Sequence, residues 1–308
     1  DWEDDARDDV DFYLGNHFTE AERDELESRN QSSVPLDRLY SAIEQFKAII
    51  TSKPPKFSAV PREDSDNKLA NVWKTILEYI WDISDGNEIF KQVVHDYTVT
   101  GLGYFYAYVD READYGRGEV KFTYIDPFRV VIDPNARNRW FDDATGMMLS
   151  TIFTKFQLLD LYPQLSEVNE KNDKMLIDEI EGYSEDETYP NPRNARIKGS
   201  YTPDVVKDYD HGEGSEKYQL IEYFSKIKVP YYRIANLQSG DERILDKANM
   251  DKMMENDEFK ELANQGLVDI VEVQQTRIKL TCALGQIVLY EYILNTDKYP
   301  IVPVPNIW

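Results

Sequence analysis

The sequence predicts an α+β protein in which a helical N-terminal part leads into a mixed or antiparallel sheet, followed by a smaller α+β module. Apolar residues recur at helical spacing through much of residues 2–98. After Tyr104, runs rich in aromatic and β-branched residues alternate with polar residues, as strands do. Residues 183–217 are rich in Pro, Gly, Asn, Asp and Ser, which is typical of a loop or linker. We therefore expect one domain over residues 1–182 and a second over residues 218–308.

Start and stop signals divide the first 52 residues into three expected helices. The first occupies residues 2–14 and ends at Gly15-Asn16. Thr19 and Glu22 form a capping-box pattern, so a second helix should follow Thr19. Pro35 is expected to start a third helix with a broad apolar face, which ends at Ser52 before two prolines.

A long fourth helix is expected up to Ile83, with Ser65 or Asn67 as its N-cap. Its apolar residues lie at helical spacing, and we expect them to face inward. They are Leu69, Val72, Trp73, Ile76, Leu77, Ile80 and Trp81. Asp85-Gly86-Asn87 should break this helix, and another should run from Glu88 to about Thr98.

The stretch from Tyr97 to Arg137 is interpreted as a small sheet on which the rest of the chain is organised. Its expected strands are Tyr104–Val109, Glu119–Ile125 and Arg129–Ile132, with a polar loop over residues 110–118. The third run lies between Asp126-Pro127 and Asp133-Pro134. Because proline restricts the residue before it to extended conformations, we interpret these two pairs as fixed corners.

The remaining chain alternates expected strands and helices. A strand over residues 147–153 precedes a helix over residues 154–162, and a further helix is expected over residues 174–180. In the second module we expect strands over residues 219–234 and 242–245, an acidic helix over residues 247–265 ended by Gly266, and strands over residues 267–284, 287–293 and 299–305.

Composition favours a folded protein without a membrane span. The 308 residues are 41% hydrophobic and include 21 Tyr and 13 Phe, which is ample for a core. No apolar run approaches the roughly 18 residues of a membrane helix, and there is no signal peptide. Since the chain lacks an initiator Met and ends soon after a strand, we expect it to be part of a longer polypeptide. The single cysteine, Cys282, is expected in the core and fits assembly in a reducing cytoplasm.

The net charge of −23 comes from 35 basic and 58 acidic side chains. Generic duplex binding draws its affinity from neutralised phosphates, so this charge argues against it. The distribution is uneven, because residues 1–30 carry twelve acids and three bases, whereas residues 31–62 carry two acids and five bases. We interpret the acidic blocks as solvated faces, or as surfaces that must not bind nucleic acid.

Motifs for metal or nucleotide chemistry are incomplete. The histidines, His17, His95 and His211, lack metal-ligand spacing and a cysteine pair. Gly101-Leu102-Gly103 enters a strand and lacks the third glycine of a dinucleotide motif. The loop starting at Asp110 resembles a calcium loop, but Tyr115 replaces its glycine and Lys121 its final glutamate.

Two aspartate pairs are the remaining candidates for catalysis. Asp126 with Asp133, or Asp142 with Asp143, could act as an acid and a base. Aspartate before proline or in a turn is far commoner as a turn residue. We therefore expect a scaffold, not an enzyme, with no catalytic, cofactor-binding or metal-binding residues.

The order of these features resembles the portal, or head-to-tail connector, proteins of tailed bacteriophages, especially the short-tailed type. The resemblance extends over nearly the whole chain and is carried by the order of several short stretches. These are Trp2 with residues 12–18, the helix over residues 36–50 with Lys53-Pro54-Pro55-Lys56-Phe57, residues 101–104, 118–120, 125–127 and 133–137, and Tyr299-Pro300-Ile301-Val302-Pro303.

The resemblance implies a virion structural protein that forms a ring, typically a dodecamer, at the capsid portal vertex after assembly in the host cytoplasm. Such a ring contacts the major capsid protein, passes double-stranded DNA non-specifically, and docks the packaging terminase and later the tail adaptor protein. It implies no cofactor and no membrane. Residues 1–182 would be wing-like, and residues from about 218 onward would belong at least partly to the clip.

Two alternatives remain open from the sequence. The chain could be another virion assembly or adaptor protein, which would share the scaffold character but not the ring. It could also be a metal-dependent hydrolase that uses an aspartate pair. Replacement of Asp126 and Asp133 by Asn separates these readings, because an enzyme would lose turnover and a scaffold would lose folding or assembly.

Overall fold

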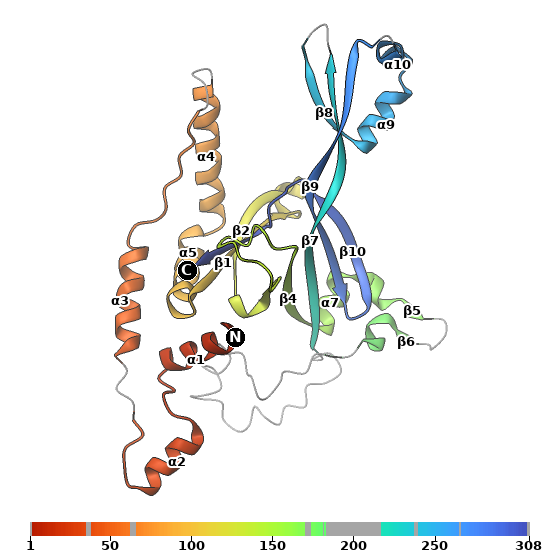
Figure 1. Ribbon diagram of the computed structural model, residues 1–308. Helices are drawn as coiled ribbons and strands as arrows, with labels where there is room; N and C mark the ends of the chain where they lie inside the picture. Colours follow the sequence, from red (N-terminus) through yellow and green to blue (C-terminus); the bar gives the residue numbers. More distant parts are fainter. Residues whose placement is uncertain are drawn as a thin grey trace.

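The computed structural model describes residues 2–34, 38–61, 66–169, 174–180, 182, 217–236, 240–264 and 266–306. It confirms the α+β fold. Helices α3 and α4 lie along one side, two antiparallel sheets occupy the centre, and a long arm of β-strands carries α9 and α10 at its far end (Figure 1). Within the described residues, no helix is long and apolar enough to cross a bilayer.

Three short helices open the chain: α1 (Trp2–Tyr13), α2 (Glu20–Ser28) and α3 (Leu39–Thr51). The predicted capping box is confirmed, since the Glu22 amide donates to the Thr19 hydroxyl and the Glu22 carboxylate accepts from the Thr19 amide. Pro35, the predicted start of the third helix, lies outside the described residues, and the described helix begins at Leu39.

The prediction that the apolar side chains of the fourth helix face inward is wrong for the first half of the helix. Helix α4 spans Asn67–Ile83, follows Asp66 as N-cap, and ends before Asp85, whose φ of 53° turns the chain into α5 (Gly86–Val99). Only Trp81 is buried in α4, against the rings of Phe57 and Phe122. The earlier turns project beyond the sheets, so their apolar side chains are exposed (Figure 1).

The first sheet has the order β11-β1-β2 and joins distant parts of the chain. Strands β1 (Leu102–Asp110) and β2 (Glu119–Ile125) form the predicted hairpin, and β11 (Ile301–Pro305) pairs antiparallel with the other edge of β1. The strand predicted over residues 129–132 is present, but the expectation that it joins this sheet is wrong. Asp126 caps a 3-10 turn, η2 (Pro127–Arg129), which redirects β3 (Val130–Ile132) onto β4 in the second sheet.

The second sheet has the order β10-β9-β7-β4-β3, with β8 paired to β7. Its further strands are β4 (Gly146–Thr154), β7 (Lys217–Asn236), β8 (Glu242–Asp246), β9 (Val268–Leu284) and β10 (Ile287–Leu294). Beside it lie α7 (Lys155–Leu161), the 3-10 turns η3 (Pro163–Ser166) and η4 (Leu176–Glu179), and the short pair β5 (Val168–Asn169) and β6 (Lys174–Met175). The helix expected over residues 174–180 is therefore wrong: this segment is β6 followed by η4.

The arm is an extension of β7 and β9, which pair antiparallel from Leu220↔Leu284 to Asn236↔Val268. The prediction of one helix over residues 247–265 is wrong, because this segment forms two helices, α9 (Lys247–Glu255) and α10 (Asp257–Asn264). Asn256 separates them because its ψ of 122° is extended. A small cluster of Ile234, Met250 and Phe259 holds these helices to the ribbon.

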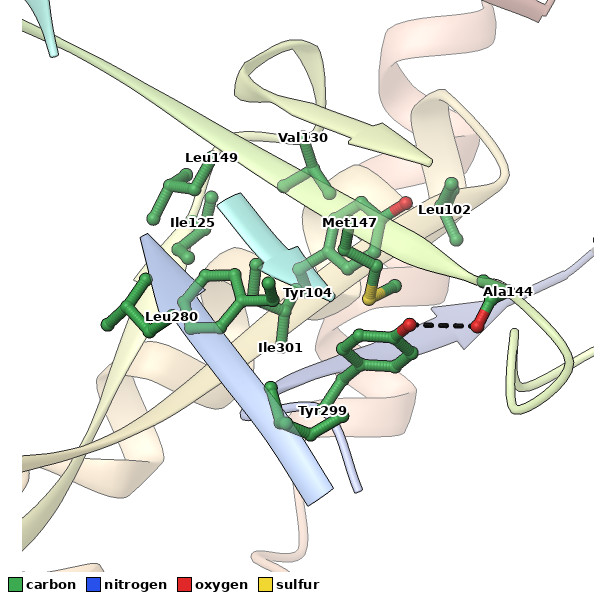
Figure 2. Packing of buried hydrophobic residues seen from close by; sticks show 12 residues of the cluster. Leu102, Tyr104, Ile125, Val130, Ala144, Met147, Leu149, Leu280, Tyr299 and Ile301 are labelled. Atoms are coloured by element: carbon green, nitrogen blue, oxygen red, sulfur yellow. Dashed lines mark hydrogen bonds between the residues drawn. The ribbon is translucent and has the colours of Figure 1, made fainter. Parts of the chain in front are cut away.

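The principal core lies where the two sheets meet. Tyr104, Met147, Phe224, Ile278 and Ile301 are at most 1% exposed there, although they come from five different strands. Figure 2 shows this packing and the hydrogen bond from the Tyr299 hydroxyl to the Ala144 carbonyl, at 2.8 Å. The prediction for Cys282 is confirmed, since it is fully buried in a second cluster beside Leu158 and Leu220.

Candidate functional site

The aspartate carboxylates of the two Asp-Pro corners accept hydrogen bonds from backbone amides of the adjoining loops. The Asp126 carboxylate is buried and accepts from the Phe128 amide at 3.1 Å. Asp133 accepts from the hydroxyl and amide of Thr145 at 2.6 and 3.1 Å, and from the Asn135 amide at 2.9 Å. These hydrogen bonds lower the pKa of the Asp133 carboxyl to about 2. Both carboxylates act as turn acceptors, as a corner requires.

Asp142 and Asp143 are adjacent in sequence but hold different parts of the chain. Asp143 accepts from the backbone amides of Arg137 and Asn138 at 2.6 and 3.0 Å, which lowers the pKa of its carboxyl. Asp142 pairs with Lys298 at 2.9 Å and thereby ties the last segment of the chain to this loop. Neither carboxylate is arranged against the other as an acid against a base.

In the loop that resembles a calcium site, the first aspartate is bonded to groups of the protein. Asp110 pairs with Lys121 at 2.7 Å and also accepts from the Glu112 amide, so its carboxylate already has a cation. Asp114 and Tyr115 both adopt positive φ, 48° and 55°, in the tight turn between β1 and β2. Among the described residues, no three His, Cys, Asp or Glu side chains are grouped to bind a metal ion.

A cleft of about 760 Å³ lies between α1, α3 and α5. Its lining mixes apolar, aromatic and charged side chains from three helices. They are Val10, Tyr13, Leu14, Tyr40, Glu44, Lys47, Ala48, Thr51, Glu88, Lys91, Gln92, His95 and Val99. Sequence analysis did not detect this cleft, because its residues come together only when three helices pack.

Four polar side chains in this cleft form one hydrogen-bonded chain. The Tyr13 hydroxyl donates to Glu44 at 2.6 Å, and Lys47 donates to Glu44 at 2.7 Å and to His95 Nδ1 at 3.2 Å. Lysine only donates, so Nδ1 of His95 is the acceptor. The bonds from Lys47 and Tyr13 lower the pKa of the Glu44 carboxyl. The network therefore joins α1 to α3 and α5.

The other histidines contribute no comparable group. His17 is half-buried, its ring lies tilted against that of Phe12 with the centroids 5.2 Å apart, and its Nε2 lies 3.2 Å from the Phe12 carbonyl oxygen. His211 lies outside the described residues. His17 is thus a partner of the turn that ends α1.

A second polar group, only partly exposed, lies on the face of the second sheet that carries Leu220 and Phe224. Glu222 on β7 lies between the buried residues Leu220 and Phe224, and accepts from the Tyr290 hydroxyl at 3.3 Å. Burial raises the pKa of the Glu222 carboxyl. Tyr290 in turn stacks on Tyr162 and Tyr292 at 6.2 and 5.8 Å. Three stacked tyrosine rings therefore lie on the side of the sheet where Tyr290 contacts Glu222.

The described chain thus combines hydrogen-bonded corners, a polar network that joins three helices, and a projecting arm. The chain belongs to the phage P22-like portal protein family, whose model matches residues 1–308. The chain is therefore a phage portal protein of the short-tailed, P22-like type, from a family of virion structural proteins that form the head-to-tail connector. Comparison with curated proteins gave no match.

Proposed function

We propose that this chain is the subunit of a closed ring, a dodecamer, at one vertex of the capsid. The ring is the conduit through which double-stranded DNA enters the head and later leaves it. It contacts the major capsid protein, docks the terminase during packaging and the tail adaptor afterwards, and assembles in the host cytoplasm. The observation that carries this proposal is the family match along the whole of residues 1–308.

The charge of the chain supports a conduit and not a DNA-binding protein. A net charge of −23 disfavours tight contact with phosphates, and DNA that must move through a ring has to avoid being held. In this proposal the protein performs no hydrolysis, and the terminase supplies the energy for translocation.

The shape of the chain supports a division of labour between its two ends. Residues 2–182, with α1–α5 and the hairpin β1–β2, would form the wing that braces the subunit. The arm of β7 and β9 with α9 and α10 would form the clip that faces the terminase or adaptor. Its exposed apolar residues include Ile244, Met254 and Val273, which suit a protein partner.

Electron microscopy and mass measurement of the purified full-length protein test the ring. We expect closed rings of about twelve subunits, and a stable monomer at micromolar concentration would overturn the proposal. Docking is tested by replacing residues 247–264 with a Gly-Ser linker in the full-length protein. Rings should persist while terminase binding is lost, whereas the single change Tyr115→Ser at the distant β1–β2 turn should leave binding intact.

A further inference from the structure

An apolar stripe on α4 lacks the cover that its sequence pattern calls for. Leu69, Val72, Trp73 and Ile76, here called the α4 stripe, lie at i, i+3, i+4 and i+7 and so share one face of the helix. Each remains between 38% and 56% exposed. A tryptophan half open to water at the centre of such a face is typical of a residue that a partner covers.

Three exposed lysines flank the stripe, which lies on a helix that also carries the carboxylates of Glu78 and Asp82. The extended segment of residues 52–61 runs alongside α4 (Figure 1), and Phe57 on it contacts Trp81 of α4 with ring centroids 5.3 Å apart. Lys53 and Lys56 on this segment and Lys68 at the start of α4 are exposed, and none forms an ion pair within the described residues. This flank therefore presents apolar contacts together with three lysines that form no ion pair among the described residues.

The opposite flank carries the complementary features. Helix α7 lies across the two sheets from α4 in Figure 1. Phe156 and Leu161 on α7 are 79% and 55% exposed. Asp160 on α7 and Glu167, which follows η3, are exposed carboxylates, and neither forms an ion pair within the described part of the chain. This flank therefore offers exposed apolar side chains that could cover the α4 stripe, and carboxylates that could pair with the lysines beside the stripe.

A second copy of the chain fits these two flanks better than a nucleic acid does. A closed ring has a heterologous interface, so each subunit must present two different and complementary surfaces on opposite sides. The flank with the α4 stripe and the flank with α7 meet that condition, because both expose apolar side chains and the lysines of one are opposite in charge to the carboxylates of the other. Phosphates would be attracted by the three lysines but would leave the α4 stripe exposed.

We propose that the α4 stripe of one subunit packs against α7 of its neighbour in the ring, with Lys53, Lys56 and Lys68 facing Asp160 and Glu167. The inference rests on the ring proposed above and names the surfaces that close it. Trp73 and Phe156 are the central apolar contacts. The charged side chains surround them and fix which flank meets which.

Photocrosslinking in the assembled full-length protein identifies what covers the stripe. We would place p-benzoylphenylalanine at position 73, and at position 115 as a control, because Tyr115 is fully exposed on a remote turn. We expect position 73 to yield a crosslinked dimer whose joined peptide lies within residues 155–167, and position 115 to yield none to that peptide. A crosslink from position 73 to its own chain, to DNA or to another virion protein, or no crosslink at all, overturns the proposal.

Charge reversal tests the pairing of the flanks. Lys56→Glu with Lys68→Glu should lower the fraction of assembled rings at fixed concentration about tenfold, and so should Asp160→Lys with Glu167→Lys. Combining all four changes should restore assembly, while each variant keeps the melting temperature of the unassembled wild-type chain. If both reversals assemble like wild type, or the combination fails to restore assembly, this interface is wrong while the portal ring stands. If wild type itself forms no ring, the proposed function fails instead.

Discussion

Asp133 shows why a carboxylate that suggests catalysis in the sequence serves a turn in the structure. Its oxygens accept hydrogen bonds from Thr145 and Asn135, which lie on either side of the loop that precedes β4. Sequence reasoning predicted the corner from Asp133-Pro134, because proline restricts the residue before it. It could not predict Thr145 as the partner, since twelve residues separate the two and only tertiary folding brings them together.

Asp133→Asn should lower stability and remove one source of acid sensitivity. The carboxyl pKa is lowered to about 2 in the folded protein, against about 3.9 in an unfolded chain. A lowered folded pKa means that the stabilisation is present above about pH 4 and is lost as the pH falls from about 4 to 2. Melting temperatures measured from pH 2 to 7 should show a shallower acid decline for Asp133→Asn. As a control, Glu112→Gln at an exposed position should show the same decline of melting temperature with falling pH as wild type. Equal slopes for all three proteins would contradict this account.

Glu222 is the opposite case, because burial raises its pKa. A raised folded pKa means that the folded state takes up a proton before the unfolded state does. Stability therefore rises as the pH falls through the folded pKa, and levels off near the unfolded value of about 4.3. At neutral pH the charged carboxylate between Leu220 and Phe224 costs stability, partly offset by the Tyr290 hydroxyl and by the charge of Arg129.

Glu222→Gln should consequently melt at a higher temperature than wild type at pH 7.5, and the difference should shrink as the pH approaches 4.5. The neutral amide avoids the desolvation of a charge and can still accept from Tyr290. Thermal unfolding followed by circular dichroism across this pH range provides the measurement. A destabilised Glu222→Gln at pH 7.5 would mean that the ionised form is favoured in its site, contrary to the raised pKa.

At the scale of elements, the features that could be predicted from sequence are those that depend on residues close together in the chain. The capping box at Thr19 and the β1–β2 hairpin depend on residues a few positions apart, and sequence signals located both. The second capping box, at Thr154, was not predicted. Asn256 carries no glycine or proline signal, so the break between α9 and α10 was not predicted. The exposed half of α4 was missed for a different reason: amphipathic spacing shows that a face needs cover but not what covers it.

The packing of α5 on β1 depends on the absence of a side chain at Gly103. A Cβ atom there would lie 2.6 Å from the Val93 carbonyl oxygen and 2.9 Å from Val93 Cγ1. Because the first of these atoms is helix backbone, α5 would have to move away from the sheet. Gly103→Ala should therefore destabilise the protein by about 1–3 kcal/mol in urea unfolding.

Gly146→Ala is the matched control for this contact. Its Cβ would come within 2.5 Å of the Tyr223 hydroxyl, but Tyr223 is 42% exposed and its ring can swing towards solvent. We expect a smaller loss than at Gly103. Equal losses at the two glycines would show that backbone approach is not the deciding factor.

At the scale of the whole molecule, the chain closes on itself through its last strand. Strand β11 pairs with β1 about 200 positions earlier, with Tyr106 opposite Ile301, and Tyr299 donates to Ala144 in the same core. The sequence predicted strands over residues 104–109 and 299–305 separately. Nothing in their local pattern indicates that they pair, since register between distant strands is decided by the core they share. The same holds for the cleft, which three separate helices build.

Ile301 and Val302 allow this closure to be tested within one strand. Ile301 is 1% exposed and packs in the core between the sheets, whereas its neighbour Val302 is 44% exposed on the other face. Ile301→Ala should cost about 2–5 kcal/mol, because it leaves a cavity that joins both sheets. Val302→Ala should cost about 0.5 kcal/mol or less. Urea unfolding of the unassembled chain, followed by tryptophan fluorescence and circular dichroism, measures both. If β11 closes a single core, Ile301→Ala should shift the two signals together, and a shift confined to one signal would mean that the sheets unfold separately.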